Sequence, residues 1–503
     1  MAYRILTWFL RIVTRVFFRQ VEVAGIENIP GTGPVLFAGN HPNSLIDPIL
    51  IITTCQRKAH FAAKDSLFKG RIMGMLLRGL GAVPLARKIE HDGKPTDAPA
   101  GAPRDSAEMG KVNDAAFEHM FGVLADGGAI GIFPEGISHD ESHLAKLKTG
   151  AARLALGGAA RTGAPIAIVP CGLTFIHPKR FRSRVLVQYG PPIEIAASTA
   201  RDAVKAATAE IENGLRRLTI NAPDWETVRA LDTVRRLYQP QEISIEDRIE
   251  LSRRFNMYYG AVAADPKVLA LMTRVRAYQE KLDELGITDR ELARDLSKLE
   301  VSARMMRHLV LVAFWLPLCV PGAPLHLPTV LFARIAGPRL TPRKDVIATT
   351  KMLVGMLLVL LSYAIAVGVV WWKAGPAWAA LAATILPLSG WATLRVLDRL
   401  RLVRRAFGVL ARRLRFRSEV QALRAERARL ADDVIRTVGE IKPPELEALF
   451  PPGHPDRFDP AQPFPGFQPA ETSQAQNDAD LDAELDKDAA EDAAEEANEA
   501  DRR

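Results

Sequence analysis

A histidine and a carboxylate, His41 and Asp47, lie six residues apart in a polar box (residues 39–48) that follows the apolar run 34–38. A neutral imidazole can accept a proton from an alcohol near neutral pH, and a carboxylate on its other nitrogen fixes the tautomer and stabilises the imidazolium. Pro42 disfavours helix at His41. We therefore expect His41 on a loop and Asp47 near the first turn of the next helix, folded back onto the imidazole. The competing interpretation is a loop histidine followed by a helix-capping aspartate.

The attacking atom in such a reaction would be the substrate's own hydroxyl oxygen. The sequence contains no Gly-x-Ser-x-Gly elbow and no cysteine with a matching signature, so a covalent acyl-enzyme has no obvious nucleophile. No cluster of His and Cys has the spacing of a metal site, so we expect neither a metal nor a cofactor.

Three later stretches bear on this interpretation: residues 64–70 leading to 81–87, residues 131–140 with Phe-Pro-Glu-Gly, and residues 168–173 with Val-Pro. Together with the His/Asp box, these ordered motifs resemble the glycerolipid acyltransferase (PlsC-like) family over about residues 20 to 195. The longer His-x5-Asp spacing is similar to the glycerol-3-phosphate/dihydroxyacetone-phosphate acyltransferase branch. The resemblance implies an α/β fold, with a mixed sheet and flanking helices.

The resemblance also implies roles for individual residues. His41 would be the general base and Asp47 would orient it, while Arg87, Glu135 and Gly136 would form the glycerol-phosphate side of the site. Where the common family pattern has Thr-Arg after Glu-Gly, this chain has Ile-Ser at residues 137–138. Lys148, or alternatively Arg153, could replace the missing positive charge. Acyl-CoA would be the co-substrate that supplies the acyl group.

The composition favours a membrane partner. The 503 residues include 66 Lys and Arg against 58 Asp and Glu, with a pI near 9.4. This excess is compatible with anionic membrane or nucleic acid, but the basic residues flank apolar stretches and no nucleic-acid module is visible. We therefore expect a lipid bilayer and no nucleic acid. Three scattered cysteines indicate a reducing compartment without disulfides.

The N-terminal half divides into two predicted parts. Residues 1–19, with arginines and threonines on one helical face, are typical of an amphipathic interfacial helix; the alternative is a helix packed on the catalytic domain. Residues 20–198 alternate strand-like and helix-like patterns, which predicts the α/β domain. Within it we expect strands at 35–38, 129–133, 166–169 and 184–189, a helix at 144–156 that ends at two glycines, and a mobile insertion at 88–110.

Residues 199–306 form a predicted helical accessory region, with helices near 200–218, 223–237, 244–260, 266–284 and 288–306. Its composition does not indicate a function beyond a structural role.

Residues 307–396 form the predicted membrane region. Residues 352–372 and 376–394 are long and apolar enough to cross a bilayer as a helical hairpin, and 309–333, cut by four prolines, fits a re-entrant or interfacial segment. Basic residues on both flanks of the hairpin predict that the catalytic domain faces the cytoplasm. Residues 397–440 resemble a basic surface helix, with a coiled-coil contact as the alternative, and 441–503 a disordered linker and acidic tail.

These features together predict an integral, multi-pass membrane enzyme that transfers a fatty acyl group from acyl-CoA to the hydroxyl of glycerol 3-phosphate or dihydroxyacetone phosphate. Two alternatives remain: a lysophosphatidate or lysophospholipid acyltransferase, and a membrane adaptor without catalytic activity.

Overall fold

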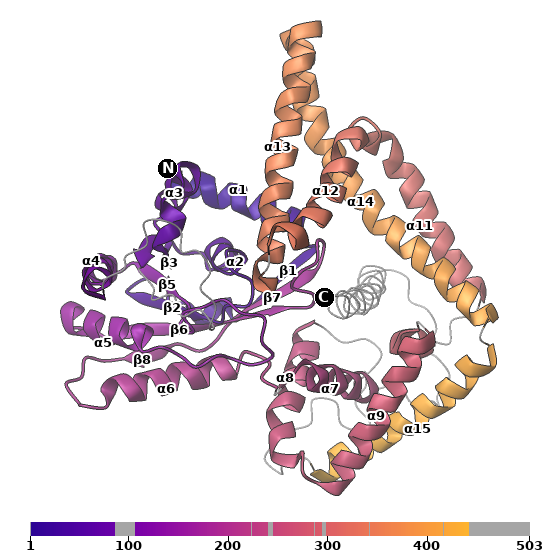
Figure 1. Cartoon of the computed structure of the whole chain (residues 1–503), viewed down its shortest axis with the longest axis horizontal. Helices are drawn as coiled ribbons and strands as arrows, with labels where there is room; N and C mark the ends of the chain where they lie inside the picture. Colours follow the sequence, from indigo (N-terminus) through magenta and orange to yellow (C-terminus); the bar gives the residue numbers. More distant parts are fainter. Residues whose placement is uncertain are drawn as a thin grey trace. The chain divides into compact units, whose positions relative to one another are not determined.

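The computed structural model describes residues 2–85, 106–222, 224–239, 245–285, 287–293, 298–341, 343–415 and 417–441 (Figure 1). The chain divides into two compact units. The first comprises residues 1–221 together with 337–352, and the second comprises 222–336 and 353–503. The predicted insertion at 88–110 lies outside the described residues up to residue 105, and almost all of the predicted tail, from residue 442 on, also lies outside them.

A mixed eight-stranded sheet forms the centre of the first unit. Its strand order is β1-β7-β6-β2-β5-β3-β4, with β8 paired to β6. The β6–β7 and β6–β8 pairs are antiparallel and the other pairs are parallel, which confirms the predicted α/β fold with a mixed sheet. The strands are β1 Gln20–Ala24, β2 Val35–Gly39, β3 Ala59–Lys64, β4 Val83–Leu85, β5 Ala129–Ile132, β6 Ile166–Phe175, β7 Arg184–Tyr189 and β8 Ile193–Ile195.

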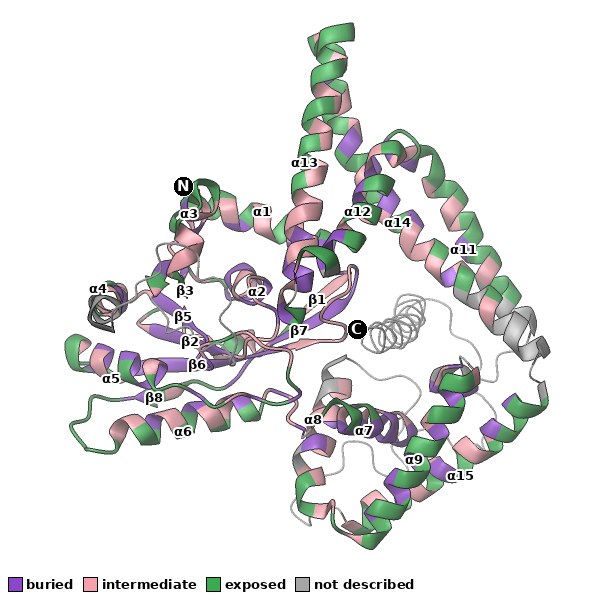
Figure 2. Cartoon of the chain, viewed as in Figure 1, coloured by how far each residue is buried: buried purple, intermediate pink, exposed green. Residues whose placement is uncertain are grey.

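Helices cover both faces of this sheet. On one face Phe37 of β2 belongs to a buried cluster with residues of α1 and α2, and on the other Leu36 belongs to a cluster with residues of α4, α5 and α6. Figure 2 shows the resulting continuous buried layer along the central strands. The helices of this unit are α1 Ala2–Phe17, α2 Ile46–Thr54, α3 Arg71–Gly79, α4 Ser106–Ala125, α5 Gly150–Thr162 and α6 Ala203–Arg216, with 3-10 turns η1 Ile26–Asn28, η2 Asp65–Phe68 and η3 Lys344–Val346.

The four predicted strands are confirmed, but the predicted helix at 144–156 was wrong in its bounds. Residues 144–149 are irregular because their N–H groups serve other partners: Ala145 N donates to Glu135 and Lys148 N to the Pro134 carbonyl. Helix α5 then continues through the two glycines that we expected to end it, at 157–158. A Cβ at these positions would come within 3 Å of Phe121 and Leu124 of α4, so glycine allows α4 and α5 to pack closely.

The α/β unit includes two segments that the sequence analysis did not assign to it. Helix α6 buries Ile211 and Leu215 in the core cluster below the sheet, so the unit extends beyond the predicted residue 198. Residues 337–352 also belong to this unit, and Ala348 and Met352 lie in the same buried cluster as Phe37. The chain therefore returns to the α/β unit after more than a hundred residues.

The second unit contains a helical bundle built from α7 to α10 and α15. The five helices share one buried cluster that includes Leu231, Tyr278 and Leu430. Helix α15 overlaps the predicted basic surface helix at 397–440, yet it contributes Leu430 and Val434 to this core. This burial is closer to the alternative of a coiled-coil contact than to a helix on the membrane surface. The bounds are α7 Trp225–Tyr238, α8 Ile245–Val262, α9 Pro266–Leu285, α10 Asp289–Ala293 and α15 Arg417–Ile441.

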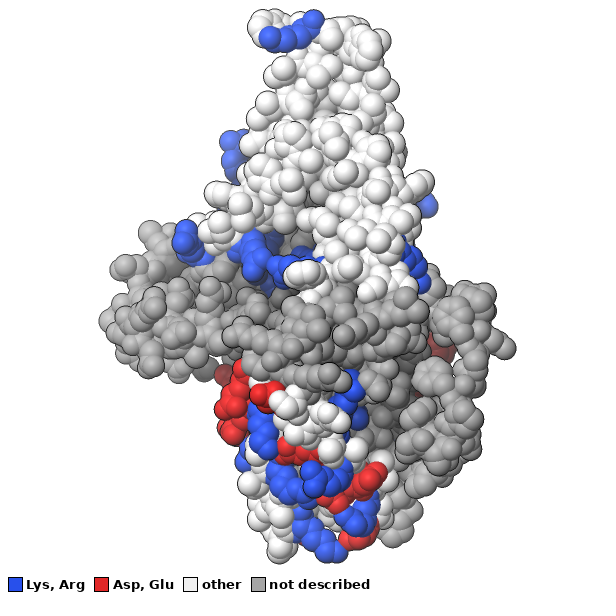
Figure 3. All heavy atoms as spheres, turned by 90° about the vertical axis from the view of Figure 1, so that its right-hand side faces the viewer, with Lys and Arg blue, Asp and Glu red and all other residues white. Residues whose placement is uncertain are grey.

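Two long apolar helices, α13 (Ile347–Ala374) and α14 (Pro376–Arg415), form a hairpin through Gly375, whose φ is 87°. Segments 344–374 and 376–404 are long and apolar enough to cross a membrane, and Figure 3 shows the largely uncharged surface of this region. Helices α11 (Lys298–Cys319) and α12 (Ala323–Leu340) form a pair bent by 108°, which could make a third span or a re-entrant loop. Helix α11 runs across the predicted boundary at residue 306.

Candidate active site

His41 and Asp47 form a direct pair at the end of β2. His41 lies in the loop after the strand, Asp47 lies in the first turn of α2, and the distance from Nδ1 to Oδ2 is 2.8 Å. The imidazole stacks on the Phe133 ring, with centroids 4.0 Å apart and planes 7° apart. The two side chains are therefore fixed relative to each other, with the imidazole oriented by the carboxylate on one edge and held by an aromatic face.

Asp47 is completely buried, and its Oδ2 also accepts a hydrogen bond from the backbone N–H of Asn43 at 2.7 Å. Burial raises the pKa of Asp47 well above its ordinary value, and the Asn43 N–H opposes that rise. A buried carboxylate interacts strongly with a nearby positive charge because the surroundings have a low dielectric constant. The arrangement thus favours the imidazolium that His41 would become on accepting a proton.

Glu135, in the loop that follows β5, connects this loop to the His41 loop by hydrogen bonds. Its Oε1 accepts from the backbone N–H of His41 at 2.8 Å, and its Oε2 accepts from Ala145 N at 2.9 Å and pairs with His139 Nε2. In addition, His139 N donates to the carbonyl of His41 at 3.2 Å. Both carboxylate oxygens of Glu135 therefore hold protein groups, and its geometry fits the positioning of the loop backbone.

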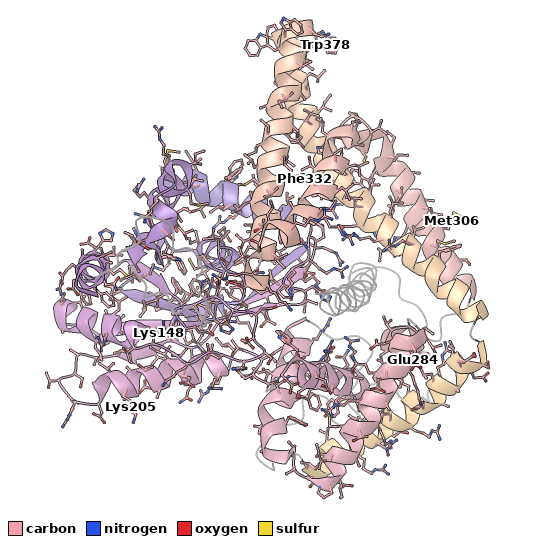
Figure 4. The ribbon with its side chains drawn as sticks, viewed as in Figure 1. Lys148, Lys205, Glu284, Met306, Phe332 and Trp378 are labelled. Carbon is pink, nitrogen blue, oxygen red and sulfur yellow. The ribbon has the colours of Figure 1, made fainter. Side chains whose placement is uncertain are left out.

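Gly136 and Lys148, both predicted near the substrate, lie against each other. Gly136 has φ 75°, and a Cβ placed on it would come within 2.8 Å of the Lys148 side chain. Lys148 N donates to Pro134 O at 2.7 Å, which fixes the Lys148 backbone beside the Phe-Pro-Glu-Gly turn. The Lys148 side chain is exposed and appears near the start of α5 in Figure 4. Its ammonium group is therefore accessible to an anion.

Two other cations, Arg87 and Arg153, belong to the predicted site. Arg87 lies outside the described residues. Arg153 lies on α5 with an exposed side chain, and within the described ranges no contact connects it to the His41 loop.

The sequence interpretation missed Asn40, which continues the pairing of β2 with β6 beyond the strand. Its side-chain amide donates to Leu173 O at 3.1 Å and its Oδ1 accepts from Leu173 N at 2.7 Å. An asparagine directly before the histidine of the polar box was the available signal. This double hydrogen bond fixes the point at which the His41 loop leaves the sheet.

It also missed residues 343–349, which contact both loops of the site. Thr349 Oγ1 donates to Asn43 O at 3.2 Å, and the Ser138 hydroxyl donates to Asp345 Oδ2 at 2.5 Å. Arg343 donates to the carbonyl of Ser138 at 3.1 Å. The charged residues of this segment resemble a membrane flank in sequence, and no local pattern relates them to a motif two hundred residues earlier.

Three carboxylates near His41 and His139 are buried. Asp47, Glu135 and Asp345 are 0%, 2% and 7% exposed. In the part of the chain that the structure describes, no group of three or more His, Cys, Asp or Glu side chains could hold a metal ion. The arrangement provides a positioned proton acceptor in a negative environment, with exposed cationic groups at the adjacent loop. Such a site can deprotonate a hydroxyl group that belongs to an anionic molecule.

Two family models match this chain and support the same class of chemistry. The family model described as Acyltransferase matches residues 20–174, and the model described as Glycerol-3-phosphate acyltransferase 2 C-terminal domain matches residues 230–446. The crystal structure of the 1-acyl-sn-glycerophosphate (LPA) acyltransferase PlsC from Thermotoga maritima is 23% identical, covering 43% of this chain and 79% of its own, with a TM-score of 0.31.

Two similar proteins come from Saccharomyces cerevisiae. Glycerol-3-phosphate O-acyltransferase 2 is 26% identical, and the match covers 72% of this chain and 65% of that protein. Glycerol-3-phosphate O-acyltransferase 1 is 29% identical, and the match covers 70% of this chain and 59% of that protein. The chain thus spans less than two thirds of the length of either relative. The two family models match in order along the chain, which is similar to these glycerol-3-phosphate O-acyltransferases.

Proposed function

We propose that the protein is an acyl-CoA-dependent O-acyltransferase that acylates glycerol 3-phosphate or dihydroxyacetone phosphate. The observation that carries the proposal is the His41–Asp47 pair, with its 2.8 Å contact and fully buried carboxylate, held to the Phe-Pro-Glu-Gly loop by Glu135. The names of the two yeast relatives point to glycerol 3-phosphate as the acceptor. The product would be a lysophosphatidate-type lipid.

In the proposed reaction, His41 Nε2 takes the proton of the acceptor hydroxyl as its oxygen attacks the thioester carbonyl of acyl-CoA. Asp47 stabilises the imidazolium through Nδ1, so the negative charge that develops on the carbonyl oxygen is matched by a positive charge nearby. The tetrahedral intermediate then collapses with cleavage of the C–S bond. The CoA thiolate leaves and takes the proton from His41, which regenerates the neutral imidazole.

Recognition of the acceptor phosphate would use Lys148, and Arg87 where the family pattern places it. The exposed Lys148 ammonium lies beside Gly136 in the loop that Glu135 ties to His41, so a phosphate there would leave the rest of a three-carbon molecule close to the base. Glu135 itself carries the wrong charge for a phosphate. Its proposed contribution to substrate binding is to fix the loop that carries Gly136.

Membrane attachment suits this reaction because the acyl donor and the product are amphipathic. Helix α1 turns Thr7 and Thr14 toward the α/β unit and leaves Trp8, 63% exposed, on an outward apolar face with Ile5, Ile12 and Val16. The exposed apolar face supports our prediction of an interfacial helix, whereas the buried Thr7 and Thr14 support the alternative of a helix packed on the domain. Basic residues at both ends of the α13–α14 hairpin support a cytoplasmic location for the active site.

The test is thiol release from palmitoyl-CoA by membranes that contain the full chain, with glycerol 3-phosphate, dihydroxyacetone phosphate or lysophosphatidate as acceptor. His41→Ala is the inactive control, and His143→Ala, an exposed histidine of the neighbouring loop, is the matched control. We expect His41-dependent release with a three-carbon phosphate. Release with lysophosphatidate alone would assign the second acylation step instead, and no His41-dependent release would favour the adaptor.

A further inference from the structure

Arg343 is a cationic side chain in contact with the loop that carries Ser138. We infer that Arg343 binds the phosphate group of the acceptor substrate, an inference that rests on the proposed function. Arg343 lies just before η3, in the segment that returns to the α/β unit before α13. Its position in the sequence, more than two hundred residues after the Phe-Pro-Glu-Gly motif, gives no indication of this role.

The guanidinium lies directly on the loop that is joined to His41. Arg343 Nη2 donates to the carbonyl and to the hydroxyl of Ser138, at 3.1 and 3.0 Å. The next residue, His139, donates its backbone N–H to the carbonyl of His41 at 3.2 Å. One residue therefore separates the guanidinium contact from the backbone of the proposed general base.

Asp345 holds this guanidinium in a fixed orientation. Its two oxygens accept from Nε at 3.1 Å and from Nη2 at 2.6 Å, and the carboxylate is only 7% exposed. A long flexible side chain is thus ordered before any substrate arrives, which reduces the entropy cost of binding. In the described structure neither Asp345 nor Ser138 contacts Nη1, and the Arg343 side chain is 59% exposed. The Nη1 edge can accept an anion.

Lys148 supplies a second positive charge on the same loop. Its side chain packs against Gly136, two residues before Ser138, and is exposed. A phosphate dianion is recognised most strongly by the planar fork of a guanidinium together with further donors, whereas a lysine acts as a point charge. Arg343 and Lys148 would thus bind the phosphate from two segments, and the hydroxyl of a three-carbon molecule would remain near His41.

The phosphates of CoA offer the same chemistry as the acceptor phosphate, so the experiment must separate the two sources. Steady-state kinetics of the membrane-embedded full chain give KM for glycerol 3-phosphate and for palmitoyl-CoA separately. The variants are Arg343→Gln, which removes the charge, and Arg343→Lys, which keeps the charge but loses the fork. The matched control is Arg339→Gln, an exposed arginine four residues earlier.

We expect Arg343→Gln to raise KM for glycerol 3-phosphate at least about tenfold, as loss of a charge-assisted hydrogen bond does, with KM for palmitoyl-CoA changed less than about twofold. The KM of Arg343→Lys for glycerol 3-phosphate should lie between those of the wild type and Arg343→Gln. Inorganic phosphate should inhibit the wild type more strongly than either variant. If Arg343→Gln does not accumulate in the membrane, Arg343→Lys provides the test, with an expected rise of about threefold or more.

Three results would overturn the inference: an effect on KM for palmitoyl-CoA alone, a lower kcat with both KM values unchanged, or behaviour equal to that of Arg339→Gln. Each of these requires a wild-type protein with His41-dependent acylation, so the proposed function would survive them. Absence of that wild-type activity would instead refute the proposed function itself.

Discussion

Thr349, in the first turn of α13, donates a hydrogen bond of 3.2 Å to the carbonyl oxygen of Asn43, 306 residues away in the sequence. Asn43 in turn donates its backbone N–H to Asp47. The start of a helix that is long and apolar enough to cross a membrane is therefore joined, through one residue, to the carboxylate that orients His41. This chain of contacts lies entirely within the α/β unit.

Replacement of Thr349 by valine should destabilise this unit. Valine has a similar shape but cannot donate, so the carbonyl of Asn43 would keep only the hydrogen bond from Ile46 N at 3.1 Å. The loss of one hydrogen bond costs about 0.5 to 1.5 kcal/mol. Thermal inactivation of the detergent-solubilised protein should occur at a lower temperature. Thr384→Val is the matched control, because this threonine of α14 is exposed and bonds only within its helix. If Thr349→Val and Thr384→Val had equal thermal inactivation midpoints, the hydrogen bond from Thr349 to Asn43 would not stabilise the unit.

Replacement of Asp47 by asparagine should lower kcat by about 10² to 10⁴, since the imidazolium would lose its carboxylate partner. KM for either substrate should change little, because Asp47 is fully buried and cannot contact a substrate. The measurement is initial-rate kinetics with glycerol 3-phosphate and palmitoyl-CoA, alongside the inactivation midpoint as a control for folding. A variant with full kcat and an unchanged midpoint would refute the role of Asp47.

The Glu135–His139 contact should make stability depend on pH. The hydrogen bond to Glu135 raises the pKa of His139 above its ordinary value of 6.5. A raised pKa in the folded state stabilises the fold fully below pH 6.5, and this contribution disappears as the pH rises through the folded-state value. The thermal inactivation midpoint of the wild type should therefore be higher than that of His139→Gln below pH 6.5. The difference between the two midpoints should become smaller as the pH rises.

The control for this pH series is His143→Gln, which changes an exposed histidine of the same loop. Its midpoint should follow that of the wild type across the whole range. A gap between wild type and His139→Gln that widened with pH would show that the contact does not stabilise the protonated histidine.

The helical bundle of the second unit should depend on Asp289. This buried carboxylate accepts from the Tyr278 hydroxyl at 2.7 Å and from Arg427 at 2.8 and 3.1 Å, and so joins α9, α10 and α15. Asp289→Ala would leave a partly buried arginine without its partner, a loss of about 3 to 5 kcal/mol. Limited proteolysis should cleave α15 faster in this variant than in Asp202→Ala, which changes an exposed aspartate of the other unit.

The sequence alone determined the local parts of this protein. Short apolar runs bounded by turn residues identified β2, β5, β6 and β7, because a buried strand needs little more than its own apolar side chains. Long uncharged runs identified α13 and the first part of α14, because a helix that crosses a bilayer must be apolar along about 20 consecutive residues. The type and spacing of His41 and Asp47, with Pro42 between them, were enough to predict the contact that the structure contains.

Only the tertiary structure decided what depends on groups far apart in the chain. Residues 144–149 stay irregular because Glu135 and Pro134 compete for their N–H groups, and α5 passes through two glycines because α4 packs there. Arg343, Asp345 and Thr349 lie in a stretch whose arginines and lysines resemble a basic membrane flank in sequence. They reach the loops of the candidate site only when the chain folds back. Local patterns contain no information about such contacts, since their partners are set by the packing of the whole unit.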